Sequence, residues 1–168
     1  AVGHSAGAAV LARMCLDGGI VPRLLISLNG ALLPLHGIAG HVFSPLARLL
    51  VRLPQVPSLL AWRARDRAAV ERVLRDTGSR LQAIDVDLYA RLFRSPAHVG
   101  ATLTMMARWE LEPLVSDLPR LATPLVLVAC SEDRAIKPDS AFAVRDLVAG
   151  SRVEYLRGLG HLAHEERP

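Results

Sequence analysis

The feature that most constrains the fold of this chain lies near its start, where residues 3–7 read Gly-His-Ser-Ala-Gly. The residues before this run are apolar, and residues 8–16 after it have the small and apolar side chains that are typical of a packed helix. A serine between two glycines, where a strand passes into a helix, predicts a tight turn that lifts the Ser5 hydroxyl clear of a sheet. We expect both glycines to be required, because a side chain at either position would collide with the neighbouring helix or strand.

The rest of the chain contains further apolar runs separated by helical patterns. Residues 23–29 and 124–129 contain short apolar runs without a polar face and predict buried parallel strands, and the alternating residues 152–156 predict another strand. A helix is expected over 138–148, and one more begins near His161. Strands separated by helices predict an α/β fold, with a mostly parallel sheet and helices on both of its faces.

Between residues 31 and 120 the pattern changes to helices and loops, with no convincing strand. Asp66 and Ser95 are well placed to cap two of these helices at their N-termini. Helical spacing is found at 45–53, 66–75, 85–93 and 96–109. We therefore expect two domains, a sheet-containing core formed by 1–30 and 121–168 and a helical cap or lid formed by 31–120.

Composition argues against several classes of protein. Hydrophobic residues make up 51% of the chain and charged residues 21%, which is a globular composition and not a disordered one. The net charge is +4, but the arginines are scattered, so no basic face for nucleic acid is expected. The most apolar stretch, 24–35, is interrupted by Asn29 and Pro34 and is too short to span a membrane. Cys15 and Cys130 have neither metal-ligand nor disulfide spacing, which predicts a reducing compartment and no metal site or cofactor.

Two other residues suit chemistry with Ser5. Asp133 and His161 each follow a predicted strand, and catalytic groups gather at the carboxyl ends of strands in parallel sheets. Taken alone, each is more simply explained as a surface or capping residue, but the chain order Ser, Asp, His predicts a nucleophile, an acid and a base. His161 would take the proton from Ser5 while Asp133 orients its ring, and the N–H of Ala6 would stabilise a negatively charged oxygen.

The sequence offers weaker candidates for substrate contacts. Residues in the turn and the predicted cap have suitable side chains, although those on helices are also well explained as core residues. His164 lacks the glycine neighbour of His161 and is expected at the surface or behind the base. His36 and His41 are expected in loops of the insert. The substrate-binding candidates are His4, Leu32, Met105, Met106 and Trp109.

Together these motifs resemble the α/β-hydrolase superfamily over nearly the whole chain. Five segments are similar to a narrower family, the magnesium chelatase accessory proteins of bacteriochlorophyll biosynthesis: 27–34, 43–50, 77–80, 89–92 and 158–166. This resemblance implies a cytoplasmic protein with an apolar or porphyrin-like small molecule as its ligand and magnesium chelatase subunits as its partners.

The chain departs from this resemblance in two respects. Cys130 stands where the strand before the acid usually ends in glycine. The superfamily also has several strands and a second oxyanion donor before the serine turn. We therefore expect these 168 residues to be a truncated part of a longer protein that folds poorly and is inactive alone. Soluble, monomeric material that unfolds cooperatively would contradict this expectation.

Three functions remain open from the sequence. The first is a serine hydrolase acting on a bulky apolar ester or a related carbonyl compound. The second is a generic esterase of the same fold. The third is a non-catalytic accessory role, in which the protein binds a porphyrin or the chelatase. Serine at the nucleophile position argues against the haloalkane and epoxide branches of the superfamily, which use aspartate there.

Overall fold

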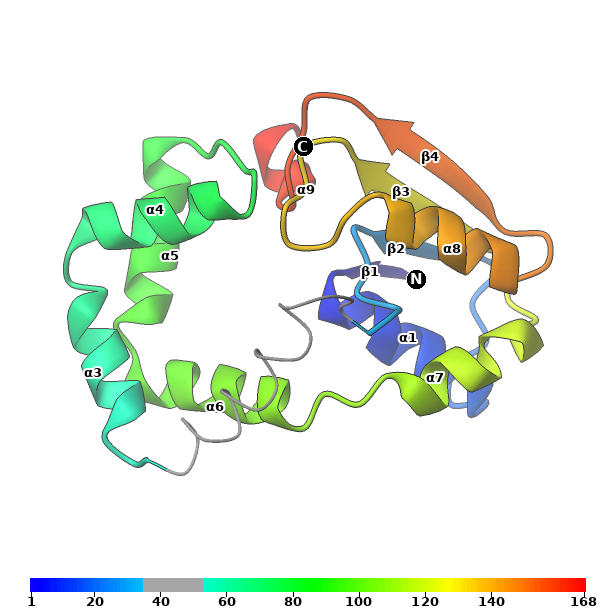
Figure 1. Ribbon diagram of the computed structural model, residues 1–168, viewed down its shortest axis with the longest axis horizontal. Coiled ribbons are helices and arrows are strands. Elements are labelled where there is room, and N and C mark those ends of the chain that lie inside the picture. The colour runs from blue at the N-terminus through cyan, green and yellow to red at the C-terminus, as the bar shows by residue number, and fades with distance from the viewer. Residues whose placement is uncertain (35–52) are drawn as a thin grey trace. The chain divides into compact units, whose positions relative to one another are not determined.

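The computed structural model describes residues 1–34 and 53–168, which divide into two compact units (Figure 1). The first unit contains the sheet and consists of residues 1–34, 77–79 and 111–168. The second is helical, and its described residues are 53–76 and 80–110. His36, His41 and all but the last residue of the helix predicted at 45–53 lie outside the described residues.

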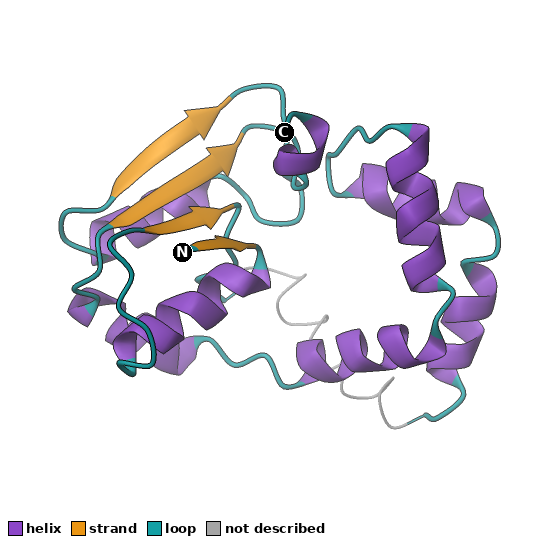
Figure 2. Cartoon of the chain, turned by 180° about the vertical axis from the view of Figure 1, so that it is seen from behind, coloured by secondary structure: helices purple, strands orange, loops and turns teal. Residues whose placement is uncertain are grey.

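The sheet of the first unit consists of parallel strands that follow one another in chain order (Figure 2). In the register, Leu25 lies beside Leu125 and Val126 lies beside Arg152. Because the strands all run the same way, their carboxyl ends meet along one edge of the sheet. The predicted parallel α/β architecture is therefore confirmed, with strands β1 (Val2–His4), β2 (Leu25–Leu28), β3 (Leu125–Cys130) and β4 (Arg152–Leu156).

Helix α1 (Ala6–Leu16) connects β1 to β2, and helix α8 (Asp139–Leu147) connects β3 to β4. Both connections advance across the sheet in the same direction, so right-handed crossovers place both helices on the same face, as Figure 2 shows. The predicted parallel sheet flanked by helices is therefore confirmed for the described residues. In β2, Leu25 and Ser27 are buried, whereas Ile26 and the last residue of the strand are half-buried.

Residues 111–120 group with the sheet unit, whereas the sequence places them in the helical insert. Helix α7 (Glu112–Asp117) and the 3-10 turn η1 (Leu118–Arg120) contact α1. Arg13 of α1 donates from Nη1 to Asp117 Oδ2 at 2.7 Å, and this contact lowers the pKa of Asp117. Leu118 is fully buried in the core of the unit. An ion pair and a buried leucine therefore hold this segment on α1.

The second unit contains helices α3 (Val56–Arg63), α4 (Arg67–Asp76), α5 (Ala83–Phe93) and α6 (Pro96–Ala107). Helix α3 packs against α6 and α4 packs against α5. The predicted N-caps are confirmed, since Asp66 Oδ1 accepts from Ala68 N–H at 3.0 Å and Ser95 Oγ accepts from His98 N–H at 3.3 Å. The sequence pattern does not indicate α3 as a separate helix.

No helix in the described part of the chain is long and apolar enough to cross a membrane.

Candidate active site

The turn after β1 holds Ser5 in a backbone conformation that non-glycine residues rarely adopt. Its φ is 51° and its ψ is −121°. The Ser5 N–H donates to the carbonyl of Leu28 at 3.0 Å, which ties the turn to the end of β2. The Ser5 carbonyl accepts from Ala8 N–H at 3.1 Å and from Ala31 N–H at 3.0 Å. These hydrogen bonds hold the strained turn and fix the direction of the serine side chain.

The two glycines that flank this turn differ in how tightly they are packed. A Cβ at Gly3 would lie 2.7 Å from both the Cα and the N of Ala8, so only glycine fits there. A Cβ at Gly7 would meet no atom within 4 Å among the described residues. The predicted collision is therefore confirmed at Gly3 and is wrong at Gly7 for the part of the chain that the structure describes.

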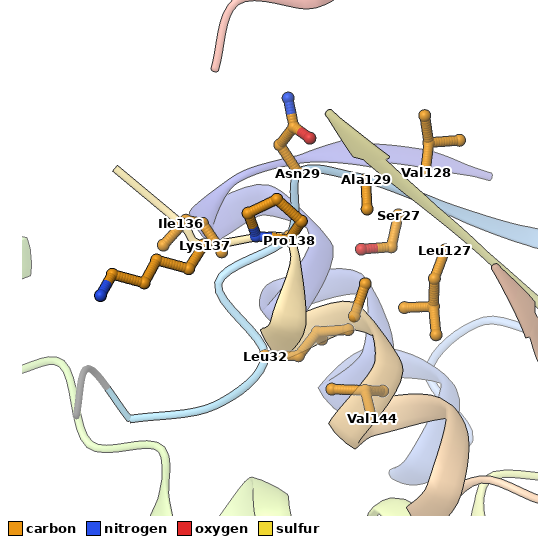
Figure 3. A pocket seen from close by; sticks show the side chains of 12 residues that line it. Ser27, Asn29, Leu32, Leu127, Val128, Ala129, Ile136, Lys137, Pro138 and Val144 are labelled. Carbon is orange, nitrogen blue, oxygen red and sulfur yellow. The ribbon is translucent and has the colours of Figure 1, made fainter. Parts of the chain in front are cut away.

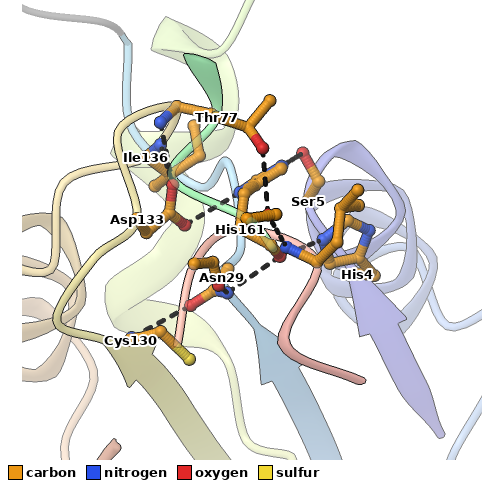
Figure 4. Close-up of polar contacts among 12 residues, drawn as sticks. His4, Ser5, Asn29, Thr77, Cys130, Asp133, Ile136 and His161 are labelled. Carbon is orange, nitrogen blue, oxygen red and sulfur yellow. Dashed lines mark hydrogen bonds and ion pairs between the residues drawn. The ribbon is translucent and has the colours of Figure 1, made fainter. Parts of the chain in front are cut away.

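The three residues predicted as nucleophile, acid and base lie in hydrogen-bonding contact (Figure 4). His161 Nε2 lies 3.0 Å from Ser5 Oγ, and His161 Nδ1 lies 2.8 Å from Asp133 Oδ2. The Asp133 side chain is 0% exposed and that of His161 is 10% exposed. The three residues follow β1, β3 and β4, so the parallel sheet brings their loops to one edge.

The Asp133 carboxylate is oriented by its own turn. Its Oδ1 accepts the backbone N–H groups of Ala135 and Ile136, each at 2.8 Å, which leaves Oδ2 for His161. With an ionised carboxylate at Nδ1, that nitrogen carries the ring proton, so Nε2 is free to accept the proton of the Ser5 hydroxyl. The arrangement can therefore perform general-base chemistry on Ser5.

Cys130, at the position where the sequence resemblance leads us to expect glycine, is accommodated in the core. Its side chain is fully buried, and burial raises the pKa of its thiol. The backbone N–H of Cys130 donates to Asn29 Oδ1 at 3.1 Å. The larger side chain thus leaves the contact between Asp133 and His161 intact.

Asn29 is a positioning residue that the sequence analysis missed. It is 5% exposed, and its Nδ2 donates to the carbonyls of Gly160 at 3.0 Å and His161 at 2.9 Å. Because Asn29 Oδ1 also accepts the Cys130 N–H, the amide connects the ends of β2 and β3 to the loop that carries His161. Asn29 has a φ of 44°, which asparagine tolerates better than most residues. An asparagine directly after a buried strand was the signal that could have identified it.

Replacing Asn29 with glycine is expected to destabilise the protein by roughly 3 kcal/mol, because it leaves two buried carbonyls and one N–H without their partner. Glycine tolerates the positive φ at this position, so the change isolates the loss of the side chain. Urea unfolding measures the difference. A variant whose unfolding free energy equals that of the wild type would show that the amide does not hold the loop.

His4, the residue before Ser5, lies against His161. Its Nε2 donates to the His161 carbonyl at 2.9 Å, because a carbonyl oxygen can only accept. The His4 ring centroid lies 4.7 Å from that of His161 and 4.5 Å from that of His164. Burial lowers the pKa of His4. His4 therefore supports the loop that carries His161, and its contact with substrate stays a prediction.

Stability is expected to depend on pH through His4. Since its pKa is lower in the folded state, the unfolded chain takes up the proton first as the pH falls. The stability that neutral His4 contributes is fully present above the ordinary histidine pKa of about 6.5. It is lost as the pH falls from there toward the lower pKa of His4 in the folded protein. Urea unfolding between pH 5 and pH 8 should show a shallower pH slope in His4→Gln than in the wild type. Equal slopes would contradict this role, because His161 and His164 remain in both proteins.

Leu32, another candidate for substrate binding, is buried in the structure, and its contact with a substrate stays a prediction. It is 1% exposed and borders a cavity of about 10 Å³ together with Ser27 and Val144 (Figure 3). A cavity of that volume is about the size of one water molecule. Leu32 is therefore a core residue of the sheet unit, packed between the sheet and α8.

The remaining substrate candidates belong to the helical unit. Met105 and Met106 lie on α6, and Trp109 follows it; Met105 is 45% exposed and the other two are half-buried. Their contact with a substrate stays a prediction. The helical unit also contains an apolar cavity of about 250 Å³. Its apolar lining includes Leu60, Val70, Val73, Phe93, Val99 and Leu103.

Ala6 is the first residue of α1, so its N–H has no acceptor within the helix. The N-terminus of a helix favours negative charge, which suits the predicted role of this N–H toward an oxyanion. That role remains a prediction. Among the residues that the structure describes, no group of three or more His, Cys, Asp or Glu side chains could hold a metal ion.

The parallel sheet, the strained serine turn and the contacts of His161 define an α/β protein with a serine placed for nucleophilic chemistry. The chain belongs to the alpha/beta hydrolase family, whose model matches residues 1–168. Its sequence is 40% identical, over 165 residues, to the magnesium-chelatase 30 kDa subunit of Rhodobacter capsulatus. The match covers 98% of this chain and 57% of that protein, so the chain spans little more than half of its relative.

Solved structures show the same fold. An alpha/beta hydrolase fold protein from Burkholderia ambifaria superposes with a TM-score of 0.74 at 21% identity, covering 99% of this chain and 61% of that one. An esterase from Exiguobacterium antarcticum superposes with a TM-score of 0.67 at 13% identity, covering 95% of this chain and 58% of that one. At these identities the likeness establishes the fold alone.

Proposed function

We propose that this chain carries the catalytic triad of a serine hydrolase, with Ser5 as nucleophile, His161 as base and Asp133 as the acid that orients the base. The observation that carries this proposal is the continuous hydrogen-bonded path from Asp133 Oδ2 through the His161 ring to Ser5 Oγ, with contacts of 2.8 Å and 3.0 Å. The strained turn at Ser5 supports it as well, because strained residues cluster at sites of chemistry.

The chemistry follows from this path. Ser5 Oγ attacks the carbonyl carbon of an ester while its proton passes to His161 Nε2. The leaving alcohol takes that proton as the bond to the acyl group breaks. Water then attacks the acyl-enzyme, giving its proton to His161, and the acid leaves as Ser5 regains its hydroxyl. Asp133 stabilises the charged imidazole in both steps, and the Ala6 N–H stabilises the oxyanion.

The substrate that we propose is a bulky apolar ester or a related acyl compound. Similarity to a protein named as a magnesium-chelatase subunit supports a porphyrin-like molecule within this class, with chelatase subunits as partners in the cytoplasm.

A series of p-nitrophenyl esters of increasing acyl length tests this function. We expect turnover by the intact protein that rises with acyl length and is absent in Ser5→Ala. A matched control is Ser151→Ala, which removes another serine hydroxyl that bonds only locally, to Val148 and Arg145. Turnover that persists in Ser5→Ala would disprove the proposal. Turnover of short esters alone would favour a generic esterase of the same fold.

A second candidate function is non-catalytic binding of a porphyrin or of the chelatase. It is favoured by the 40% identity to the chelatase-named relative, since that name describes a subunit and not a hydrolase. Titration of protoporphyrin into the intact protein should then shift the Soret band with saturation. An unchanged spectrum, together with no co-purification with chelatase subunits, would exclude this role.

A further inference from the structure

Residues 77–79 leave the helical part of the chain and join the sheet unit. They connect α4, which ends at Asp76, to α5, which begins at Ala83, yet they group with the residues of the sheet unit. Here they contact both the loop that carries Asp133 and the loop that carries His161, and Figure 4 shows Thr77 near these two residues. The proposed catalysis does not use this segment.

The segment is hydrogen-bonded to both catalytic loops. The Thr77 carbonyl accepts from Arg134 N–H at 3.0 Å, next to Asp133 in the chain. Ser79 Oγ accepts from Leu162 N–H at 2.9 Å, next to His161 in the chain. Thr77 Oγ1 donates to Ser79 Oγ at 2.9 Å, and this bond fixes the hydroxyl oxygen that accepts the Leu162 N–H.

The backbones also pack too closely here for any side chain. Gly78 has a φ of 88°, and a Cβ on it would overlap the carbonyl oxygen of Glu132. A Cβ on Gly160 would overlap the backbone of Gly78 and lie 2.5 Å from Ser79 N. Residues 77–79 are therefore in direct backbone contact with the loop that carries Asp133 and with the loop that carries His161. A shift of one of these segments is transmitted to the others.

Ser79 binds a part of the loop carrying His161 that Asn29 and Glu166 do not bind. Asn29 binds the carbonyls of Gly160 and His161, and Glu166 Oε1 accepts the Gly160 N–H at 2.8 Å. The N–H of Leu162 is received by Ser79, which is 1% exposed. Without that hydroxyl, a buried donor would lose its partner directly beside His161.

We propose that Ser79 is a positioning residue of the triad, which acts through the Leu162 N–H to set the distance between His161 Nε2 and Ser5 Oγ. This inference rests on the proposed hydrolase function. Proton transfer depends steeply on geometry, and a misplacement of about 1 Å lowers rates by about 100-fold. In the described structure Ser79 is hydrogen-bonded to Thr77 and Leu162 and not to Ser5 or His161.

The test compares Ser79→Ala with Ser151→Ala in the intact protein, using the rate of inactivation by a fluorophosphonate. We expect Ser79→Ala to react roughly 10- to 100-fold more slowly per folded molecule, whereas Ser151→Ala reacts at the wild-type rate. Thr77→Val, which leaves the acceptor of Leu162 in place, should show a smaller loss. Circular dichroism establishes the folded fraction of each variant.

A second readout does not depend on activity. The proton shared by His161 Nδ1 and Asp133 should give a far-downfield signal in the proton NMR spectrum of the wild type, absent in His161→Gln. We expect this signal to shift or broaden in Ser79→Ala and to remain unchanged in Ser151→Ala. A folded Ser79→Ala protein with the wild-type signal and the wild-type inactivation rate would overturn the inference.

The two readouts separate this inference from the function on which it rests. A wild-type protein that does not react with the fluorophosphonate would count against the hydrolase, and the NMR signal would then decide the role of Ser79 alone. A reactive wild type with an equally reactive Ser79→Ala would leave the hydrolase standing and remove the positioning role.

Discussion

Replacing Asp133 with asparagine is expected to lower kcat for ester hydrolysis by about 10⁴-fold, with little change in KM. An amide at this position can donate to His161 Nδ1, which favours the tautomer whose proton sits on Nε2. That nitrogen then faces Ser5 Oγ with a proton and cannot accept another one. Steady-state kinetics on a p-nitrophenyl ester, together with a circular dichroism spectrum to verify folding, measure the effect.

Asp139→Asn is the matched control for this substitution. Asp139 lies exposed in the first turn of α8, so the same chemical change there should leave kcat within about twofold, as is usual for surface substitutions. A loss of less than about tenfold in Asp133→Asn would mean that this carboxylate does not set the tautomer of His161.

Replacing Gly78 with alanine is expected to destabilise the intact protein by about 4 kcal/mol or more, because the new methyl group overlaps the Glu132 carbonyl oxygen. Backbone atoms on both sides must move, since Gly78 also lies against Gly160. The positive φ of 88° adds strain that an L-residue does not tolerate well. Urea unfolding followed by circular dichroism measures the change.

Gly150 offers a control with the same backbone strain and no collision. Its φ is 75°, and an added Cβ would meet nothing within 4 Å among the described residues. Gly150→Ala should therefore cost only about 1 kcal/mol, the penalty for an L-residue at positive φ. Equal losses at the two positions would show that residues 77–79 are not packed against the loops that carry Asp133 and His161.

Much of the sheet could be predicted from the sequence, because buried parallel strands are short apolar runs with clear ends. The strand predicted at 124–129 is observed at 125–130, and the one predicted at 152–156 is observed there. The proximity of Ser5, Asp133 and His161 could be predicted from the sequence for a related reason. In a parallel sheet, residues that follow different strands share one edge, so chain order alone indicates their proximity.

The contacts that orient these residues could not be predicted in the same way. Asn29 is separated from His161 by 132 positions, and Ser79 is separated from Leu162 by 83. Nothing local to either residue reveals such a partner, because both bonds depend on how distant loops pack. The grouping of residues 111–120 with the sheet unit likewise depends on Arg13, far away in the sequence. Gly7 shows the opposite error, since the sequence pattern suggested a contact that the described residues do not make.

The most direct test of the central claim is fluorophosphonate labelling of the intact protein, followed by peptide mapping with mass spectrometry. An activated serine reacts with this probe, whereas an ordinary surface serine does not. We predict a single labelled peptide with the modification on Ser5, and no labelling in Ser5→Ala or His161→Gln. A folded protein that remains unlabelled, or labelling that persists in Ser5→Ala, would contradict the account, and binding in magnesium insertion would then become the leading explanation of this site.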